Sequence, residues 1–108
     1  MFVNHAEFPP IKQGKEGEFL AWFAWSSAIY KTFNGFISRR LLKATDGSGS
    51  FVGVVEHESK ETFMAMHLSE ERKKAWERVA PLLEGKAKPH FYEEIMRADA
   101  AAPPGGGS

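Results

Sequence analysis

The chain has 108 residues, of which 43% are hydrophobic and 13% aromatic, enough for one domain with its own core. Its 14 basic residues balance its 14 acidic residues, and this zero formal charge gives no reason to expect nucleic acid or a membrane as a partner. The absence of cysteine excludes disulfides and thiolate chemistry and favours a cytoplasmic location.

The N-terminal part of the chain predicts a strand followed by an aromatic helix. No basic segment followed by an apolar run opens the chain, so we expect no signal peptide. Phe2–Phe8 alternates in the manner of a strand, and Pro9 and Pro10 end it because proline cannot donate to a ladder. In Glu18–Phe33, helical spacing places a broad apolar arc on one side. The arc consists of Phe19, Trp22, Phe23, Ser26, Ile29, Tyr30 and Phe33, with Trp25 at its edge.

The middle of the chain predicts a hairpin. Asn34-Gly35 is expected to close the helix as a left-handed cap. Phe36–Thr45 and Phe51–Glu58 both alternate, and the turn-forming residues 46–50 lie between them. In the first of these strands, strict alternation groups Phe36 with Ser38, Arg40 and Leu42.

Two further helices and a fourth strand complete the predicted elements. Ser59 and Ser69 are expected to be N-caps of a short helix and a longer one. Pro81 predicts a loose last turn of the longer helix. Pro89–Arg97 alternates like a strand, and residues 98–108 are rich in Ala, Pro and Gly, so we expect a tail or linker there.

The order βαββαβ predicts a ferredoxin-like α+β domain over residues 1–97. In this fold an antiparallel sheet carries helices on one face. Apolar residues occur on both sides of the strands, for example Val52 and Val54 opposite Phe51 and Val55. Because a monomer would leave the second apolar face exposed, we expect a homodimer with the two sheets face to face.

A series of short motifs over residues 1–97 resembles the antibiotic biosynthesis monooxygenase (ABM) family of dimeric α+β barrels. The motifs are Asn4 in the first strand, Phe19, Asn-Gly-Phe at 34–36, Val-Glu-His-Glu-Ser at 55–59, Phe63, His67 and Ser69. The family includes cofactor-independent oxygenases of quinols and polyketide anthrones, haem-degrading oxygenases, and members without known activity. A fold alone does not decide among them.

Three functions therefore stay open. The first is a monooxygenase that uses O₂ on a small aromatic quinol or phenol and needs no cofactor. The second is a haem-binding or haem-degrading protein. For that branch the resemblance implies an Asn on the first strand, a Trp on the third strand and an iron-binding His on the last helix. Asn4 matches the first, whereas His57 stands at the second position and Trp76 close to the third, so the haem ligand would have to be His57 or His67. The third is a non-catalytic protein that binds a small ligand or a partner.

Asn4, His57 and His67 are the candidate catalytic residues. Asn4 shares an apolar strand face, so its amide needs a hydrogen bond, either from neighbouring backbone or from a ligand oxygen or O₂. His57 lies among apolar residues, where burial would keep it neutral and able to act as a base, although it can equally be a hydrogen-bonded structural residue. His67 ends the short helix, as a cap or as a base or haem ligand.

The pocket walls are expected to be aromatic. The candidates for binding an aromatic substrate are Trp22, Phe23, Trp25, Phe63 and Trp76. The His and Glu residues match no established metal-ligand spacing, so we expect no metal site. Arg39 and Arg40 are interpreted either as solvating a strand end or as holding an anionic substrate.

Overall fold

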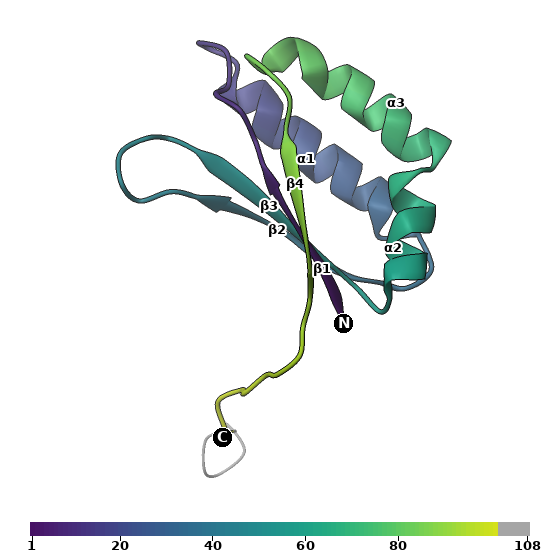
Figure 1. Cartoon of the computed structure of the whole chain (residues 1–108). Helices are drawn as coiled ribbons and strands as arrows, with labels where there is room; N and C mark the ends of the chain where they lie inside the picture. The colour runs from purple at the N-terminus through teal and green to yellow at the C-terminus, as the bar shows by residue number, and fades with distance from the viewer. Residues whose placement is uncertain (102–108) are drawn as a thin grey trace, which may run out of the picture.

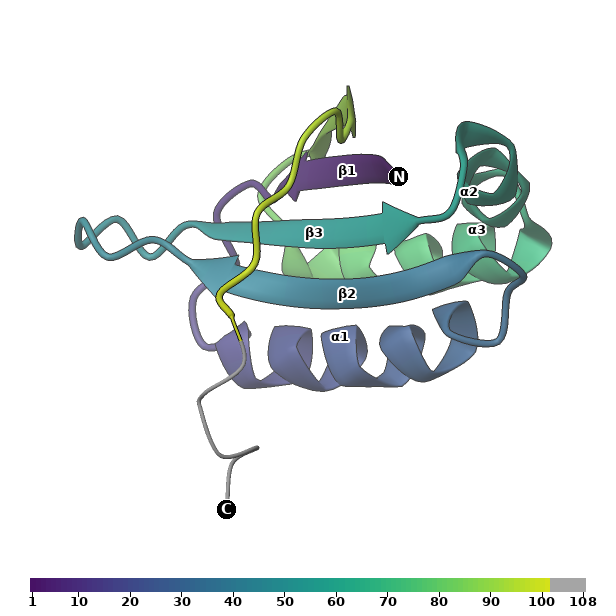
Figure 2. The ribbon, with the colours of Figure 1, turned by 90° about the horizontal axis from the view of Figure 1, so that it is seen from below.

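The computed structural model describes residues 1–101 and has the predicted ferredoxin-like architecture (Figure 1). The elements are β1 (Phe2–Glu7), α1 (Glu16–Tyr30), β2 (Phe36–Lys43), β3 (Phe51–His57), α2 (Lys60–His67), α3 (Glu70–Val79), a 3₁₀ turn (Ala80–Leu82) and β4 (Lys88–Glu93). The strands are antiparallel in the order β2-β3-β1-β4, and the helices lie on one face of the sheet (Figure 2). The predicted tail of residues 98–108 lies mostly outside the described residues.

The register of the sheet places Asn4 in its centre. Asn4 pairs with Val55 of β3 on one side and with Phe91 of β4 on the other. Ala6 is likewise flanked by Gly53 and Pro89 on the same face of the sheet. Asn4 and Ala6 are both buried, so a polar amide points from the middle strands into the layer between sheet and helices.

An irregularity in β2 changes the predicted sides of that strand. The register shifts between Phe36 and Ser38, so Phe36 pairs with His57 and Arg39 pairs with Val55. The prediction that Phe36 shares a side with Ser38 is therefore wrong. A bulge adds one residue to a strand, and side chains on either side of it no longer follow strict alternation. The bulge turns Arg39 towards the helices.

Two hydrophobic clusters fill the space between the sheet and the helices. One gathers around Phe19 and Trp22 of α1, and the other around Tyr30 and Phe63. Trp22 also donates a hydrogen bond from Nε1 to the carbonyl of Ala75 at 2.8 Å, which joins α1 to α3. The aromatic helix is thus covered by the sheet on one side and by α3 on another.

The predicted caps have different outcomes. Ser59 accepts a hydrogen bond from the backbone of Thr62 in a capping box, and Ser69 accepts one from Arg72. The predicted cap at Gly35 is wrong in position, because α1 already ends at Tyr30. Gly35 has a φ of +83° in the following turn, and a methyl group there would overlap the side chain of Thr62.

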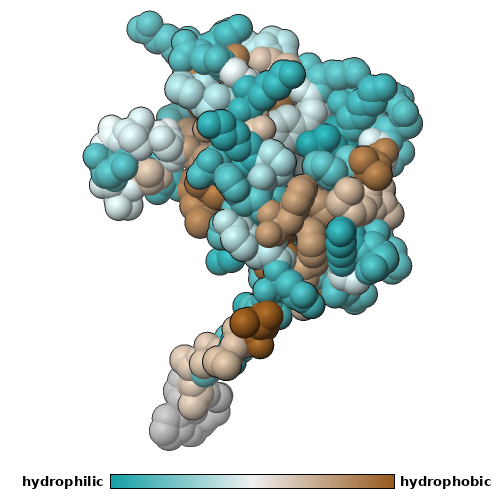
Figure 3. All heavy atoms as spheres, in the orientation of Figure 1, coloured by the Kyte–Doolittle hydropathy of each residue, from teal (hydrophilic) through white to brown (hydrophobic). Residues whose placement is uncertain are grey.

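The C-terminal segment leaves the sheet earlier than predicted. β4 ends at Glu93, not Arg97, and the chain then crosses the helix-free face (Figure 2), where Arg97 lies 4.0 Å from Glu56. Ile95 and Met96 are 90% and 87% exposed on this segment, although their alternation suggested a strand. Figure 3 shows hydrophobic side chains on this segment and in a patch between the sheet and α2. No helix among residues 1–101 is long and apolar enough to span a membrane.

Candidate functional site

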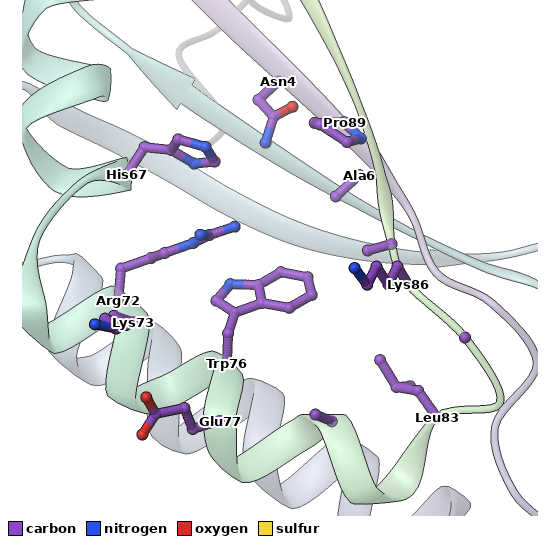
Figure 4. Close-up of a pocket in the computed structure, with 13 residues that line it drawn as sticks. Asn4, Ala6, His67, Arg72, Lys73, Trp76, Glu77, Leu83, Lys86 and Pro89 are labelled. Carbon is purple, nitrogen blue, oxygen red and sulfur yellow. The ribbon is translucent and has the colours of Figure 1, made fainter.

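A cavity of about 470 Å³ lies between α3 and the β1–β4 side of the sheet (Figure 4). Its wall includes Asn4, Ala6, His67, Arg72, Lys73, Trp76, Glu77, Leu83, Lys86 and Pro89. A smaller hollow of about 30 Å³ lies deeper between sheet and helices, with Tyr30, Arg39 and Phe63 in its lining. Asn4, Ala6, His67, Arg72 and Trp76 line both spaces, so the hollow is the inner end of the cavity.

Asn4 brings a polar group to the sheet side of this cavity. Its side chain is 6% exposed, and its Oδ1 atom has no hydrogen-bond partner among the described residues. A buried acceptor without a partner costs free energy unless a ligand or water supplies the missing donor. The structural alternative for Asn4, a bond to neighbouring backbone, is not observed at Oδ1.

His67 also lines the cavity, and its ring points towards Asn4 on the side opposite Trp76 (Figure 4). It is the last residue of α2, and its ring stacks on Phe63 with centroids 5.2 Å apart. Burial lowers the pKa of His67 below its ordinary value, and the nearby Arg72 guanidinium lowers it further. The imidazole is therefore neutral near pH 7, the form that accepts a proton or ligates a metal.

Trp76 and Arg72 form the helix side of the cavity. Trp76 stacks on Phe8 with ring centroids 5.7 Å apart and planes at 9°. The guanidinium carbon of Arg72 lies 4.8 Å from the centre of the Trp76 ring, an arrangement that favours the cation electrostatically. An indole fixed in this way gives a flat apolar surface suited to an aromatic ligand.

Arg39 and Tyr30 line the inner hollow. Nη1 of Arg39 donates to Ser26 Oγ at 2.7 Å and Ser27 Oγ at 2.9 Å. Its guanidinium carbon lies 3.9 Å from the centre of the Phe23 ring and 4.6 Å from that of Tyr30. Burial lowers the pKa of Arg39 to about 10 and raises the pKa of Tyr30, so at neutral pH the first is charged and the second is protonated.

His57 does not reach the cavity. It is 0% exposed, with the rings of Phe36 and Phe63 edge-on at 5.8 and 5.7 Å. Its Nδ1 lies 3.0 Å from Thr62 Oγ1, and Nε2 has no hydrogen-bond partner within residues 1–101. Burial lowers the pKa of His57. This geometry matches the structural interpretation, in which the imidazole anchors the end of β3 to the start of α2.

The aromatic residues expected to bind substrate are divided among three places. Trp76 lines the outer cavity and Phe63 the inner hollow. Trp22 and Phe23 belong to the core cluster beneath them. Trp25 is 39% exposed on the outer side of α1, with the guanidinium carbon of Arg78 4.2 Å from its ring centre, so it is not a wall of this cavity.

Sequence reasoning missed Tyr30 and Arg72 at this site and left Arg39 between two interpretations. Helical spacing places Tyr30 in the core, and the bulge in β2 hides the direction of Arg39. One available signal was Ser26, a hydroxyl on an otherwise aromatic helix face, because a buried hydroxyl needs a polar partner. No group of three or more His, Asp or Glu residues with metal-binding geometry occurs within residues 1–101.

Comparison with known proteins identifies the fold. No protein-family model and no curated protein matches the sequence. A solved structure of a Deinococcus radiodurans protein assigned to the antibiotic biosynthesis monooxygenases superposes with a TM-score of 0.81 at 10% identity, covering 94% of this chain and 99% of that one. A Nitrosomonas europaea protein with the same assignment gives 0.77 at 16% identity, covering 89% and 100%.

A third similar structure is SnoaB, a cofactor-independent oxygenase from Streptomyces nogalater. Its TM-score is 0.71 at 19% identity, covering 89% of this chain and 92% of that one. The resemblance read from the sequence motifs is thus confirmed at the level of the fold: the chain has the α+β ferredoxin-like fold of the ABM proteins.

Proposed function

We propose that this protein is a cofactor-independent monooxygenase that uses O₂ on a small phenolic or quinol substrate. The observation that carries the proposal is the pair of Asn4 and His67, which line the same cavity opposite Trp76 (Figure 4). One supplies a buried acceptor without a partner, and the other supplies an imidazole whose pKa is lowered. SnoaB, which has the same fold, is a cofactor-independent oxygenase, and this supports the reaction class.

In the proposed reaction His67 accepts the phenolic proton and leaves an electron-rich anion. One electron passes from the anion to O₂, and the resulting radical pair combines to form a carbon–oxygen bond. The peroxide takes the proton back from His67, the O–O bond breaks, and water leaves with the ring hydrogen. One oxygen atom stays in the product and the other becomes water. The substrate supplies all four electrons that reduce O₂, so the reaction needs no external reductant.

Asn4 and Trp76 position and stabilise the reacting groups in this proposal. Asn4 Oδ1 accepts a hydrogen bond from a substrate hydroxyl, and its NH₂ group donates to the developing oxyanion. Trp76 holds the aromatic ring flat between α3 and the sheet. His57 serves the fold and takes no proton from substrate.

Oxygen uptake with 1,4-dihydroxynaphthalene tests this function. Enzyme freed of metals by a chelator should consume O₂ faster than the spontaneous oxidation of the quinol. Asn4→Ala and His67→Gln should each lose about 10²–10⁴-fold of the enzymatic rate, the range expected for a general base or an oxyanion contact. Full activity in both variants would contradict the proposed mechanism. No enzymatic uptake by folded wild-type protein would favour the non-catalytic binding function.

Haem binding is the second candidate function, and His67 favours it. The neutral imidazole of His67 on the cavity wall would hold the iron, and Lys73, Lys86 and Arg72 around the cavity would pair with the propionates. His57 does not fit that role because it is enclosed by Phe36 and Phe63. Bound haem would supply iron-based O₂ chemistry. Titration with hemin, with a Soret band lost in His67→Ala, would support this candidate, and an unchanged free-hemin spectrum would exclude it.

We also propose that two copies pack through the helix-free face of the sheet. This face carries Leu42, which pairs with Val52, at 47% exposure, and Tyr92, which pairs with Val3, at 52%. An exposed apolar sheet face is stabilised when a second sheet covers it. Sedimentation at micromolar concentration should give the mass of a dimer, and a Leu42→Asp variant should shift it to the monomer. A wild-type monomer would contradict the proposed assembly.

A further inference from the structure

The inner hollow contains two guanidinium groups and no acidic group. Arg39 of β2 and Arg72 of α3 both line it, and none of the side chains around it is Asp or Glu. Neither arginine takes part in an ion pair within residues 1–101. A cation held away from water without a counter-ion is costly, so two of them at one place require compensation.

The buried charge of Arg39 is compensated by more hydrogen bonds than that of Arg72. Arg39 donates from Nη1 to Ser26, Ser27 and the carbonyl of Phe23. Arg72 has only the face of Trp76 against its guanidinium, and no hydrogen bond from that group to a protein acceptor is present among the described residues. The nitrogens of Arg72 are therefore free to bind a ligand.

Tyr30 adds an unused polar group to the same hollow. Its residue is 2% exposed, and its hydroxyl has no hydrogen-bond partner within residues 1–101. Neutral at pH 7, this hydroxyl can donate to an anion. Two cationic forks and a hydroxyl donor around one small space form a set suited to a carboxylate, which accepts up to four hydrogen bonds in a plane.

The hollow and the outer cavity differ in size, so they can hold different parts of one ligand. The hollow of about 30 Å³ admits a group of a few atoms, whereas the outer cavity of about 470 Å³ admits an aromatic ring system. We propose that the substrate is an aromatic acid, whose carboxylate binds Arg72 and Arg39 in the hollow while its hydroxylated ring lies against Trp76. The reaction on that ring rests on the proposed function, whereas the binding of the acid does not.

Binding without turnover tests the proposal first. Under nitrogen, quenching of tryptophan fluorescence is titrated with 2-naphthoate and with 2-naphthamide, which has the same shape and no charge. We expect 2-naphthoate to bind at least about tenfold more tightly, as charge-assisted hydrogen bonds require. Arg72→Met should remove this preference, and Lys74→Gln, an exposed cation on the same helix, should keep it.

A second variant, Tyr30→Phe, keeps the test valid if Arg72→Met does not fold. Tyr30→Phe keeps the ring and removes only the hydroxyl, so it should weaken 2-naphthoate several-fold and leave 2-naphthamide unchanged. Equal affinity for acid and amide, an unaltered preference in folded Arg72→Met, or no saturable binding of 2-naphthoate would overturn the proposal. Equally tight binding of neutral 2-naphthol would also overturn it, because the arginines would then recognise a hydroxyl.

Turnover separates this proposal from the proposed function. With O₂ present, 1,4-dihydroxy-2-naphthoate should have a lower KM than 1,4-dihydroxynaphthalene, and Arg72→Met should raise only the first KM. If 2-naphthoate binds through Arg72 but neither quinol is oxidised, the monooxygenase function fails and the acid site stands. If both quinols are oxidised with the same KM, the function stands and the acid site fails.

Discussion

Arg39 on β2 donates a hydrogen bond from Nη1 to Ser26 Oγ on α1 at 2.7 Å. The bond crosses from the sheet to the helix layer and fixes a cation beside the Phe23 and Tyr30 rings. It also explains why a serine occupies the aromatic side of α1, since a hydroxyl there accepts a donor that no apolar side chain could satisfy.

Ser26→Ala should lower the free energy of unfolding by about 1.5–3 kcal/mol, the usual contribution of a hydrogen bond to a charged group. The reason is that Arg39 loses its shortest acceptor while staying largely enclosed. Urea denaturation measures the change in the wild-type protein and, for comparison, in a protein that already carries Arg39→Met. In that background Ser26→Ala should cost less than about 0.5 kcal/mol. An equal cost in both backgrounds would mean that the bond does not contribute.

Gly35 is expected to be among the least replaceable glycines. Gly35→Ala combines a φ of +83° with overlap of the new methyl group and Thr62, so we expect a loss of about 2–5 kcal/mol. Gly47 is the matched control, because its φ is +86° and no atom lies within 4 Å of the position that a methyl group would take. Gly47→Ala should lose only about 1–2 kcal/mol. Equal losses would show that Thr62 moves aside freely.

His57 should make stability depend on pH. Its pKa is lowered by burial in the folded state, so the unfolded chain binds the proton more tightly. The free energy of unfolding therefore has its full value above the ordinary pKa of 6.5. It falls as the pH decreases from there towards the lowered pKa of the folded state. His57→Asn should flatten part of this decline in chemical denaturation between pH 7.5 and 5. An unchanged slope would contradict burial of a neutral imidazole.

His67 should control the pH profile of activity. Burial and Arg72 lower the pKa of His67, so the proposed base becomes protonated only at a lower pH than an ordinary imidazole, and the plateau of kcat/KM should extend to a correspondingly lower pH before it falls in acid. The fall should disappear in the residual activity of His67→Gln and persist in His57→Asn. The same profile in all three proteins would remove His67 as the base.

Much of the fold could be predicted from local patterns. Alternation gave the strands, and Ser59 and Ser69 marked two helix starts, because these signals depend on a few neighbouring residues. The 3₁₀ turn at Ala80–Leu82 followed from Pro81, which cannot continue an α-helix. The domain limits at 97, the cytoplasmic location and the dimer stay predictions.

The site was harder to predict because it depends on tertiary geometry. A single bulge in β2 turns Arg39 inwards, and no pattern in the local sequence predicts that bulge. Trp25 borders the apolar arc of α1 but faces outwards. Whether a residue at the edge of such an arc is buried depends on how far the packed neighbouring element extends over the helix. Asn4 and His67 both line the cavity, and their catalytic roles stay predictions, whereas Phe63 separates His57 from the cavity.

Oxygenation in ¹⁸O₂ is the sharpest test of the proposed monooxygenase function. Metal-free protein is mixed with 1,4-dihydroxynaphthalene, and the product is analysed by mass spectrometry beside a sample without protein. We expect protein-dependent 2-hydroxy-1,4-naphthoquinone carrying one ¹⁸O atom, with one water formed per O₂ and loss of this product in His67→Gln. Protein-dependent product that forms only after flavin, haem or a metal is added, or none at all, would contradict it.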